Sequence, residues 1–381
     1  MRNRWILFAA VLLPAWQLPG RAEEPPVPRP NVERLFVSGE TGYGRYRIPA
    51  LYVTPKQTVL AFCEGRVKAS GLTGDIDLVL RRSTDGGKTW APLQVVADDG
   101  PNTLGNPCPV VDRSTGIIWL PFSRSLGQDT EDEIVKGTST ERTQVWITKS
   151  ADEGLTWSKP VDISAQATRP QWTWYGPGPG IGLQLPSGRL FIPAYHAVEK
   201  TGIYQVHSLY SDDHGQTWQI GGTVADETTE AQAALRADGT LVINTRNISP
   251  RDEKVIRNRV IALSRDEGKT WTDVGRDAAL TESSCQGSLL VYSGLGDGGR
   301  SRWLFTNPPG PGRRQLTLRL SYDEGRTWAK SLVIEPGSSE YSGLARLPNG
   351  EIGVLYERNT QKKYSPEIVF TRLPLSEIEG P

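Results

Sequence analysis

Cysteine, histidine and methionine are all scarce in this chain of 381 residues, which has three cysteines, three histidines and one methionine. The cysteines are Cys63, Cys108 and Cys285, and the histidines are His196, His207 and His214. Three cysteines cannot form a disulfide framework, although one pair could be bridged. Neither set has the spacing of a metal-binding motif. We therefore expect a protein that works without a cofactor or a metal centre.

A long apolar run is also missing. The run Trp5–Trp16 is too short to cross a membrane comfortably, and it follows the basic residues Arg2 and Arg4. Small residues before position 23 offer a cleavage site, so residues 1–22 are predicted to be a signal peptide. The alternative is an uncleaved membrane anchor. We expect export to the periplasm or the medium, without stable membrane insertion after cleavage, and a short proline-rich linker over 23–31.

The chain also has no excess of charge of either sign. The 43 Lys and Arg residues balance 43 Asp and Glu residues. Cleavage after residue 22 removes Arg2, Arg4 and Arg21 and no acid, so the net charge moves from 0 to about −3. Because no basic excess remains, nucleic acid is not an expected partner.

What the chain does have is one octapeptide, Ser-x-Asp-x-Gly-x-Thr-Trp, in five copies. The copies are Ser83–Trp90, Ser150–Trp157, Ser211–Trp218, Ser264–Trp271 and Ser321–Trp328. Serine and aspartate side chains can accept hydrogen bonds from nearby backbone N–H groups, and glycine supplies a positive φ. An alternating apolar run precedes each copy, so the octapeptide is predicted to be a tight turn that ends a β-strand.

The spacing of the copies predicts the fold. The chain divides into six units of roughly 50–65 residues with four predicted strands each, which is near the size of a propeller blade. We predict an all-β protein, a six-bladed β-propeller of four-stranded antiparallel blades over residues 32–376, with a tail over 377–381. Residues Arg34–Val37 are expected to supply the strand that the sixth unit lacks. A β-sandwich is the alternative.

In such blades the octapeptide lies on the outer rim of one face, which makes it scaffold, and polar residues from other turns converge on the opposite face. The starts of first strands and the ends of second strands contribute Arg47, Arg66, Glu230, Arg246, Tyr341 and Glu357, with Arg313 just before a third strand. Several arginines beside two glutamates and a tyrosine predict a site for an anion. Trp172, Trp174, Tyr175 and His196 could line that site or serve as packing.

Several motifs carry a resemblance to a known family. They are the octapeptides, Tyr46-Arg47-Ile48-Pro49, Glu64-Gly65-Arg66 and Leu355-Tyr356-Glu357. On these motifs the chain resembles the sialidase superfamily, in particular bacterial exo-α-sialidases with Asp-box repeats. The resemblance implies a hydrolase that releases a terminal sialic acid or a related 2-keto sugar acid from glycans.

The resemblance also implies roles for individual residues. An arginine triad would clamp the substrate carboxylate, and it maps to Arg47, Arg246 and Arg313, with Arg314 as an alternative to Arg313. Glu357 would hold Arg47. Tyr341 would be the nucleophile and Glu230 its base. Arg66 is expected in the site, and its contact with substrate is left open.

One position departs from the family pattern. The acid/base aspartate of the family falls at Leu72, which cannot donate a proton, and nearby Asp75 could substitute only if the loop is rearranged. The departure raises the alternative of a non-catalytic glycan-binding propeller. A two-carboxylate polysaccharide hydrolase is a further alternative, against which the arginines argue.

Overall fold

The computed structural model describes residues 32–68, 71–249, 257–294, 299–359 and 366–380. The predicted signal peptide (1–22) and linker (23–31) lie outside these residues. Within the described residues the chain forms 25 strands and three helices of four to six residues: α1 (Glu131–Lys136), α2 (Ser164–Ala167) and α3 (Ser376–Glu379). The protein is therefore all-β.

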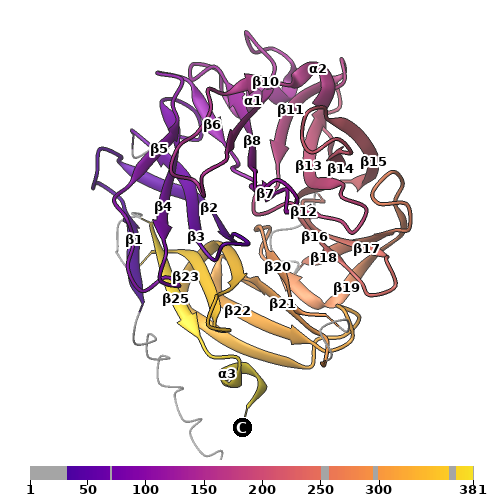
Figure 1. Ribbon diagram of the computed structural model, residues 1–381. Helices are drawn as coiled ribbons and strands as arrows, with labels where there is room; N and C mark the ends of the chain where they lie inside the picture. The colour runs from indigo at the N-terminus through magenta and orange to yellow at the C-terminus, as the bar shows by residue number, and fades with distance from the viewer. Residues whose placement is uncertain (1–31, 69–70, 250–256, 295–298, 360–365, 381) are drawn as a thin grey trace, which may run out of the picture.

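The strands of the described residues form four hydrogen-bonded sheets, which Figure 1 shows arranged around a common centre. The nine-stranded sheet contains β2 (Arg45–Val53), β3 (Val59–Arg66), β4 (Ile76–Ser83), β5 (Gln94–Ala97), β6 (Thr103–Gly105), β7 (Val110–Val111), β8 (Ile118–Ser125), β9 (Gln144–Ser150) and β10 (Val161–Asp162). The five-stranded sheet contains β11 (Trp172–Pro177), β12 (Leu183–Gln184), β13 (Leu190–Val198), β14 (Tyr204–Ser211) and β15 (Gln219–Asp226).

The remaining two sheets complete the arrangement. The four-stranded sheet contains β16 (Thr228–Leu235), β17 (Leu241–Asn247), β18 (Arg257–Ser264) and β19 (Thr272–Glu282). The seven-stranded sheet contains β1 (Glu33–Val37), β20 (Ser288–Ser293), β21 (Arg302–Asn307), β22 (Arg314–Ser321), β23 (Lys330–Arg346), β24 (Ile352–Asn359) and β25 (Glu367–Leu373). Helix α3 packs on β22 and β23, and it buries Ile378 in the core of that sheet.

The first and last strands pair with each other, as the sequence predicts for residues 34–37. Strand β1 lies antiparallel to β25, with Glu33 opposite Phe370 and Val37 opposite Glu367. The pairing covers an edge of β25 that would otherwise expose unpaired backbone groups, and it joins the two ends of the described chain.

The sheets do not coincide with the predicted four-stranded units. Strand β23 runs without a break through a region where the sequence predicts two strands in successive units, and it pairs first with β22 and then with β24. A parallel bridge between Ile76 and Thr103 likewise joins the first two units into one sheet. Hydrogen bonding between strands therefore continues across boundaries that the repeat spacing sets.

Each octapeptide forms the same hydrogen-bonded turn. In the first copy the Ser83 hydroxyl donates to Asp85 Oδ1 at 2.7 Å, and the backbone N–H of Gly87 donates to Ser83 Oγ at 2.8 Å. Thr89 donates its N–H and its hydroxyl to the two oxygens of Asp85, at 2.9 and 2.6 Å. The equivalent bonds recur in the other four copies. The glycines have φ of 77–87°, so a Cβ there would be strained.

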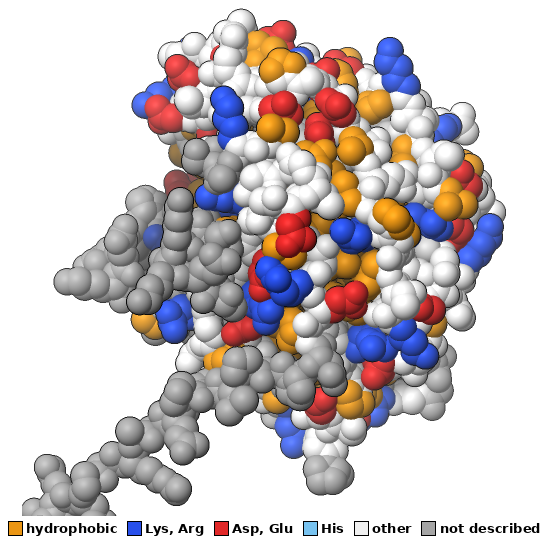
Figure 2. Space-filling view, turned by 90° about the vertical axis from the view of Figure 1, so that its left-hand side faces the viewer, with side chains coloured by type: hydrophobic (Ala, Val, Ile, Leu, Met, Phe, Trp, Pro, Cys, Tyr) orange, Lys and Arg blue, Asp and Glu red, His pale blue; other side chains and the backbone are white. Residues whose placement is uncertain are grey.

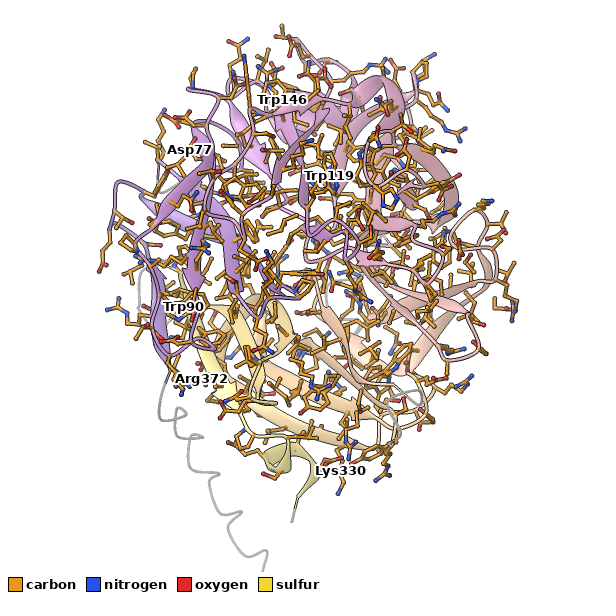
Figure 3. The ribbon with its side chains drawn as sticks, in the orientation of Figure 1. Asp77, Trp90, Trp119, Trp146, Lys330 and Arg372 are labelled. Atoms are coloured by element: carbon orange, nitrogen blue, oxygen red, sulfur yellow. The ribbon has the colours of Figure 1, made fainter. Side chains whose placement is uncertain are left out.

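The octapeptide tryptophans connect neighbouring units. Trp157, Trp218 and Trp271 pack edge-on against Phe62, Trp119 and Phe191, each of which belongs to the preceding unit. Trp90 of the first unit packs on Phe370 of the last, with ring centroids 5.1 Å apart; Trp90 and Trp119 are labelled in Figure 3. The turn therefore stabilises contacts between units as well as its own strand pair.

Removing an octapeptide aspartate should reduce stability in a pH-dependent way. Asp85→Ala is expected to lower the free energy of unfolding by about 1 kcal/mol, because two backbone donors and two hydroxyls lose their acceptor. Hydrogen bonds from Thr89 hold the pKa of Asp85 well below its usual range. A depressed folded-state pKa stabilises above the unfolded pKa of about 4, so the difference should shrink as pH falls below that value. Urea denaturation at neutral and acidic pH measures this difference in the free energy of unfolding.

Thr84→Ala serves as the control. Thr84 is the exposed neighbour of Asp85, and its replacement should leave stability unchanged. Equal stability of the two variants at neutral pH would contradict the expectation.

Three further features concern the thiols, membrane crossing and the distribution of charge. The three cysteines are buried free thiols. Among the described residues there is no helix of the length and apolar character that a membrane crossing requires. On the face shown in Figure 2, basic and acidic side chains are interspersed rather than gathered in one patch.

Candidate functional site

One cavity of about 250 Å³ collects residues from strands that are far apart in sequence. Its wall is formed by Arg47, Ile48, Glu64, Arg66, Leu72, Thr103, Gly105, Asn106, Ser123, Glu131, Trp174, Tyr195, Glu230, Arg246, Arg313 and Tyr341. These residues come from all four sheets, and none belongs to an octapeptide. Three larger hollows, of about 560, 480 and 340 Å³, lie elsewhere, and none of them is lined by both a tyrosine and a carboxylate.

A tyrosine and a glutamate form a pair at the base of the cavity. The Tyr341 hydroxyl donates a hydrogen bond to Glu230 Oε1, and both residues are 5% exposed. The Tyr341 ring packs against Ile48 and Cys285, which fixes its position. Burial, and then the charge of Glu230, raise the pKa of Tyr341 well above its usual value. The Glu230 carboxylate is thus in direct contact with the phenol proton and can act as its acceptor.

Three guanidinium groups surround that tyrosine. Arg246 Nη1 donates to Glu230 Oε2 at 2.8 Å and to the Tyr341 oxygen at 3.3 Å. The guanidinium carbons of Arg47 and Arg313 lie 5.4 and 5.6 Å from the centroid of the Tyr341 ring. Three forked donors around one point suit a planar carboxylate, which accepts paired hydrogen bonds from guanidinium groups.

Two further glutamates hold the arginines in place. Arg47 Nε donates to Glu357 Oε1 at 2.8 Å, and Glu357 is fully buried behind it. Glu340 Oε2 accepts from Arg47 Nη2 at 2.9 Å and from Arg313 Nη1 at 2.6 Å, so one carboxylate joins two of the three arginines. These contacts reduce the freedom of long side chains before any ligand arrives.

The backbone is irregular close to Tyr341, Glu230 and Arg47. In three strand pairs one strand carries an extra residue at the site, between Arg47 and Ala50, between Thr229 and Ala231, and between Ser339 and Ser342. Such β-bulges turn a side chain out of the ladder. They account for the positions of three lining residues: Ile48, Glu230 and Tyr341.

Two of these positions also hold strained backbone. Ile48 has φ of 61° and Glu230 has φ of 33°, and a positive φ is a genuine outlier for a β-branched residue. The Ile48 N–H donates to Glu357 Oε1 at 2.7 Å, which helps to hold the strained conformation. Strain of this kind persists where surrounding contacts over-determine it, often at functional sites.

The cavity wall includes six of the eight residues predicted to be catalytic or substrate-binding, namely Arg47, Arg66, Glu230, Arg246, Arg313 and Tyr341. Arg66 donates to Glu64 Oε2 from Nη2 at 2.6 Å and to the carbonyl oxygen of Gly71 at 3.0 Å. Arg314 is exposed on β22 and does not line the cavity.

The loop after β3 places Leu72, not Asp75, on the cavity wall. Asp75 is half-buried, and its carbonyl oxygen accepts from the Val67 N–H at 3.0 Å. Of the four aromatic candidates, Trp174 lines the cavity, whereas Trp172 stacks on His196 with centroids 3.6 Å apart and Tyr175 is fully buried.

Several residues of the site were not predicted from sequence. Glu340 directly precedes the predicted nucleophile, and that adjacency is the one signal that could have pointed to it. Glu131 begins α1 and accepts a hydrogen bond from the Tyr204 hydroxyl at 2.9 Å. Burial raises the pKa of the Glu131 carboxyl. No motif precedes Glu131 or Asn106. Among the described residues no three His, Cys, Asp or Glu side chains gather as metal ligands.

Comparisons with known proteins agree with the geometry. A family model described as a BNR repeat-like domain matches residues 57–354. The chain is 34% identical over 352 residues to a sialidase of Micromonospora viridifaciens, covering 87% of this chain and 52% of that protein, so it spans about half the length of that relative. It is 30% identical over 432 residues to an exo-alpha-sialidase of Aspergillus fumigatus, covering 100% and 99% of the two chains. The structure of the Hadza microbial sialidase Hz136 is similar with a TM-score of 0.79 at 30% identity, over 90% of this chain and 68% of that one.

Proposed function

The chain belongs to the sialidase superfamily, and from this premise we propose that it is a retaining exo-glycosidase that releases a terminal sialic acid or a related 2-keto sugar acid. The observation that carries the proposal is the Tyr341–Glu230 pair inside a group of three arginines. We propose in addition that the strands group into six four-stranded blades, with hydrogen bonding that continues from one blade to the next within the larger sheets. The contact between Trp90 of the first unit and Phe370 of the last supports that arrangement.

The proposed reaction has two steps. Arg47, Arg246 and Arg313 bind the substrate carboxylate, and the Tyr341 oxygen attacks the anomeric carbon while its proton passes to Glu230. The bond to the aglycone oxygen breaks, and the aglycone leaves with the electron pair. Water then attacks the anomeric carbon and loses a proton to solvent, the bond to Tyr341 breaks, and the tyrosine oxygen recovers its proton from Glu230. Two inversions give net retention.

A tyrosine suits this substrate better than a carboxylate would. The anomeric carbon of a 2-keto sugar acid carries a carboxylate, which would repel an anionic Asp or Glu nucleophile. The neutral Tyr341 hydroxyl avoids the repulsion until Glu230 removes its proton. The same charge argument explains why arginines surround Tyr341.

Leu72 on the cavity wall favours a second candidate function, a glycan-binding protein without turnover. One assay separates the two. Hydrolysis of an aryl α-sialoside, with the α-anomer as the first product in NMR spectra, supports the enzyme. Binding of sialic acid without turnover of this or any other aryl keto-acid glycoside would leave only the binding function.

The arginine clamp can be tested with two adjacent residues. Arg313→Ala should raise KM for an aryl sialoside by about 10- to 100-fold, because the carboxylate loses a charged hydrogen-bond donor worth about 1.5–3 kcal/mol. Arg314→Ala removes the same charge one residue away, outside the cavity wall, and should leave KM unchanged. Steady-state kinetics measures both. Equal effects of the two substitutions would contradict the clamp and indicate a long-range charge effect.

A further inference from the structure

The mouth of the cavity is marked by a single exposed residue. Of the described residues that line the cavity, Leu72 alone is exposed, at 59%. Glu131, Trp174, Arg246 and Arg313 are half-buried, and the remaining lining residues are buried. Arg66 holds this loop in place, because its Nη1 donates to the carbonyl oxygen of Gly71 at 3.0 Å. An apolar side chain therefore stands where the cavity opens to solvent.

The direction of attack brings the leaving group toward that opening. Tyr341 is buried at the base of the cavity, 5% exposed, and displacement at a carbon expels the leaving group on the side away from the nucleophile. The aglycone consequently points from the base toward the mouth. Leu72 is the residue that it meets there, and a leucine side chain has no proton to donate.

The acids in the cavity wall do not replace the proton donor that is missing at the mouth. Glu64 and Glu230 are 4% and 5% exposed, below the mouth, and each accepts hydrogen bonds from a guanidinium group. Glu131 is nearer the mouth, but it belongs to α1 and is held by the Tyr204 hydroxyl of β14, whereas Leu72 comes from the loop between β3 and β4. Glu131 is thus the one rival donor among the described lining residues, and it can be tested directly.

We propose that Leu72 restricts this site to sugar-acid derivatives whose leaving group departs as a stable anion, such as aryl glycosides. The inference rests on the proposed function. In the first step the phenol proton of Tyr341 goes to Glu230, and the aglycone leaves as a phenolate that takes no proton from the protein. In the second step the attacking water loses its proton to solvent without a general base, so the glycosyl-enzyme intermediate breaks down slowly.

A series of sialosides tests the proposal. The leaving groups run from a nitrophenol through an unsubstituted phenol to the sugar alcohol of sialyl-lactose. The rate at which the wild-type protein forms the glycosyl-enzyme intermediate should fall steeply as the leaving group becomes more basic. Leu72→Asp should flatten that dependence and raise kcat/KM for sialyl-lactose by about 10²- to 10⁴-fold, the usual size of general acid catalysis, with little effect on the nitrophenyl substrate.

A matched control separates the position of the new acid from its charge. Val67 lies on the same loop, is 42% exposed and does not line the cavity. Val67→Asp adds the same carboxyl group and should leave the dependence on leaving group as steep as before. Since Leu72 is exposed, its replacement removes no core packing, and thermal denaturation of both variants checks that they are folded.

The second step has its own readout. Azide attacks a glycosyl-enzyme intermediate without a general base, forming a carbon–nitrogen bond while the bond to Tyr341 breaks and the tyrosine recovers its proton from Glu230. Azide should therefore accelerate steady-state turnover of the nitrophenyl sialoside and yield a sialyl azide. Leu72→Asp should weaken the acceleration, because the added carboxylate both activates water and repels the anion.

The outcomes distinguish this inference from the proposed function. A shallow dependence in the wild-type protein, with sialyl-lactose turned over nearly as fast as the aryl substrates, overturns the inference and leaves the proposed function standing. If that dependence becomes steep only in Glu131→Gln, then Glu131 is the proton donor, which also overturns it. Absence of turnover for every aryl substrate rejects the proposed function, and the inference with it.

Discussion

Tyr341→Phe should reduce turnover of an activated aryl sialoside by at least about 10³-fold, because it removes the oxygen that forms the covalent intermediate in the proposed mechanism. Phenylalanine keeps the ring that packs on Ile48 and Cys285, so the protein should remain folded. The three arginines stay in place, and sialic acid should still bind with a Kd close to that of the wild-type protein. Stopped-flow release of the phenol and calorimetric titration with sialic acid measure the two effects.

A control and a companion variant sharpen the interpretation. Tyr52→Phe removes a hydroxyl outside the cavity wall and should leave turnover unchanged. Glu230→Gln retains a hydrogen-bond partner for Tyr341 but cannot accept its proton, so it should lower kcat strongly as well. If Tyr341→Phe retained more than a tenth of the wild-type activity, the nucleophile would have to be another group, and the proposed mechanism would be wrong.

Arg259→Met should destabilise the protein by about 3–5 kcal/mol, the expected cost of leaving one member of a buried ion pair alone. Arg259 and Glu282 are both fully buried, with Nη1 donating to Glu282 Oε2 at 2.8 Å. Arg259 Nη1 also donates to the carbonyl oxygen of Cys285 at 2.9 Å, next to the ring of Tyr341. The pair therefore supports the floor of the cavity, and chemical denaturation measures its loss.

The same variant should be strongly sensitive to pH. Burial raises the pKa of the Glu282 carboxyl, and the charge of Arg259 opposes that rise. Without Arg259 the folded-state pKa lies further above the unfolded value of about 4.3. A raised folded-state pKa favours folding at low pH, so the deficit should shrink as pH falls through the folded pKa and grow as pH rises.

Two further variants bound this prediction. Adding Glu282→Gln to Arg259→Met removes the unpaired charge and should recover a large part of the lost stability, as a double-mutant cycle would detect. Arg265→Met breaks an exposed pair with Asp273, whose side chains are 64% and 55% exposed, and should leave the free energy of unfolding nearly unchanged. Equal destabilisation by Arg259→Met and Arg265→Met would show that burial of the pair is unimportant.

Much of the local structure could be predicted because its causes are local. The octapeptide contains its own hydrogen-bond donors and acceptors within seven residues, so Ser83, Asp85 and Thr89 form the same turn wherever the pattern occurs. Alternating apolar residues ahead of it predict strands, and regular spacing predicts repeated units. The pairing of β1 with β25 was also predicted from sequence, because the sixth unit lacks a strand and needs one from elsewhere in the chain.

Some residues of the site could likewise be predicted from sequence, and others could not. Arg47, Arg246, Arg313, Glu230 and Tyr341 were identified from sequence because they stand at corresponding ends of repeated strands and match family motifs. The contacts of Glu340 with Arg47 and Arg313 were not predicted, because Glu340 belongs to none of those motifs and its partners are 293 and 27 residues away. Glu131 likewise enters the site on a short helix that interrupts the repeat and that has no counterpart at the same place in the other units, as far as the structure describes them.

The sequence by itself determined the strand-and-turn repeat, the all-β class and the set of residue types that an anionic sugar would need. Only the tertiary structure decided how those residues are aimed. The bulges that turn out Ile48, Glu230 and Tyr341 depend on register against a partner strand, which no local pattern encodes. The exposure of Leu72 at the mouth depends on which surfaces the surrounding sheets leave open. Local hydrogen bonding and periodicity are written along the chain, whereas register and burial arise only when distant segments meet.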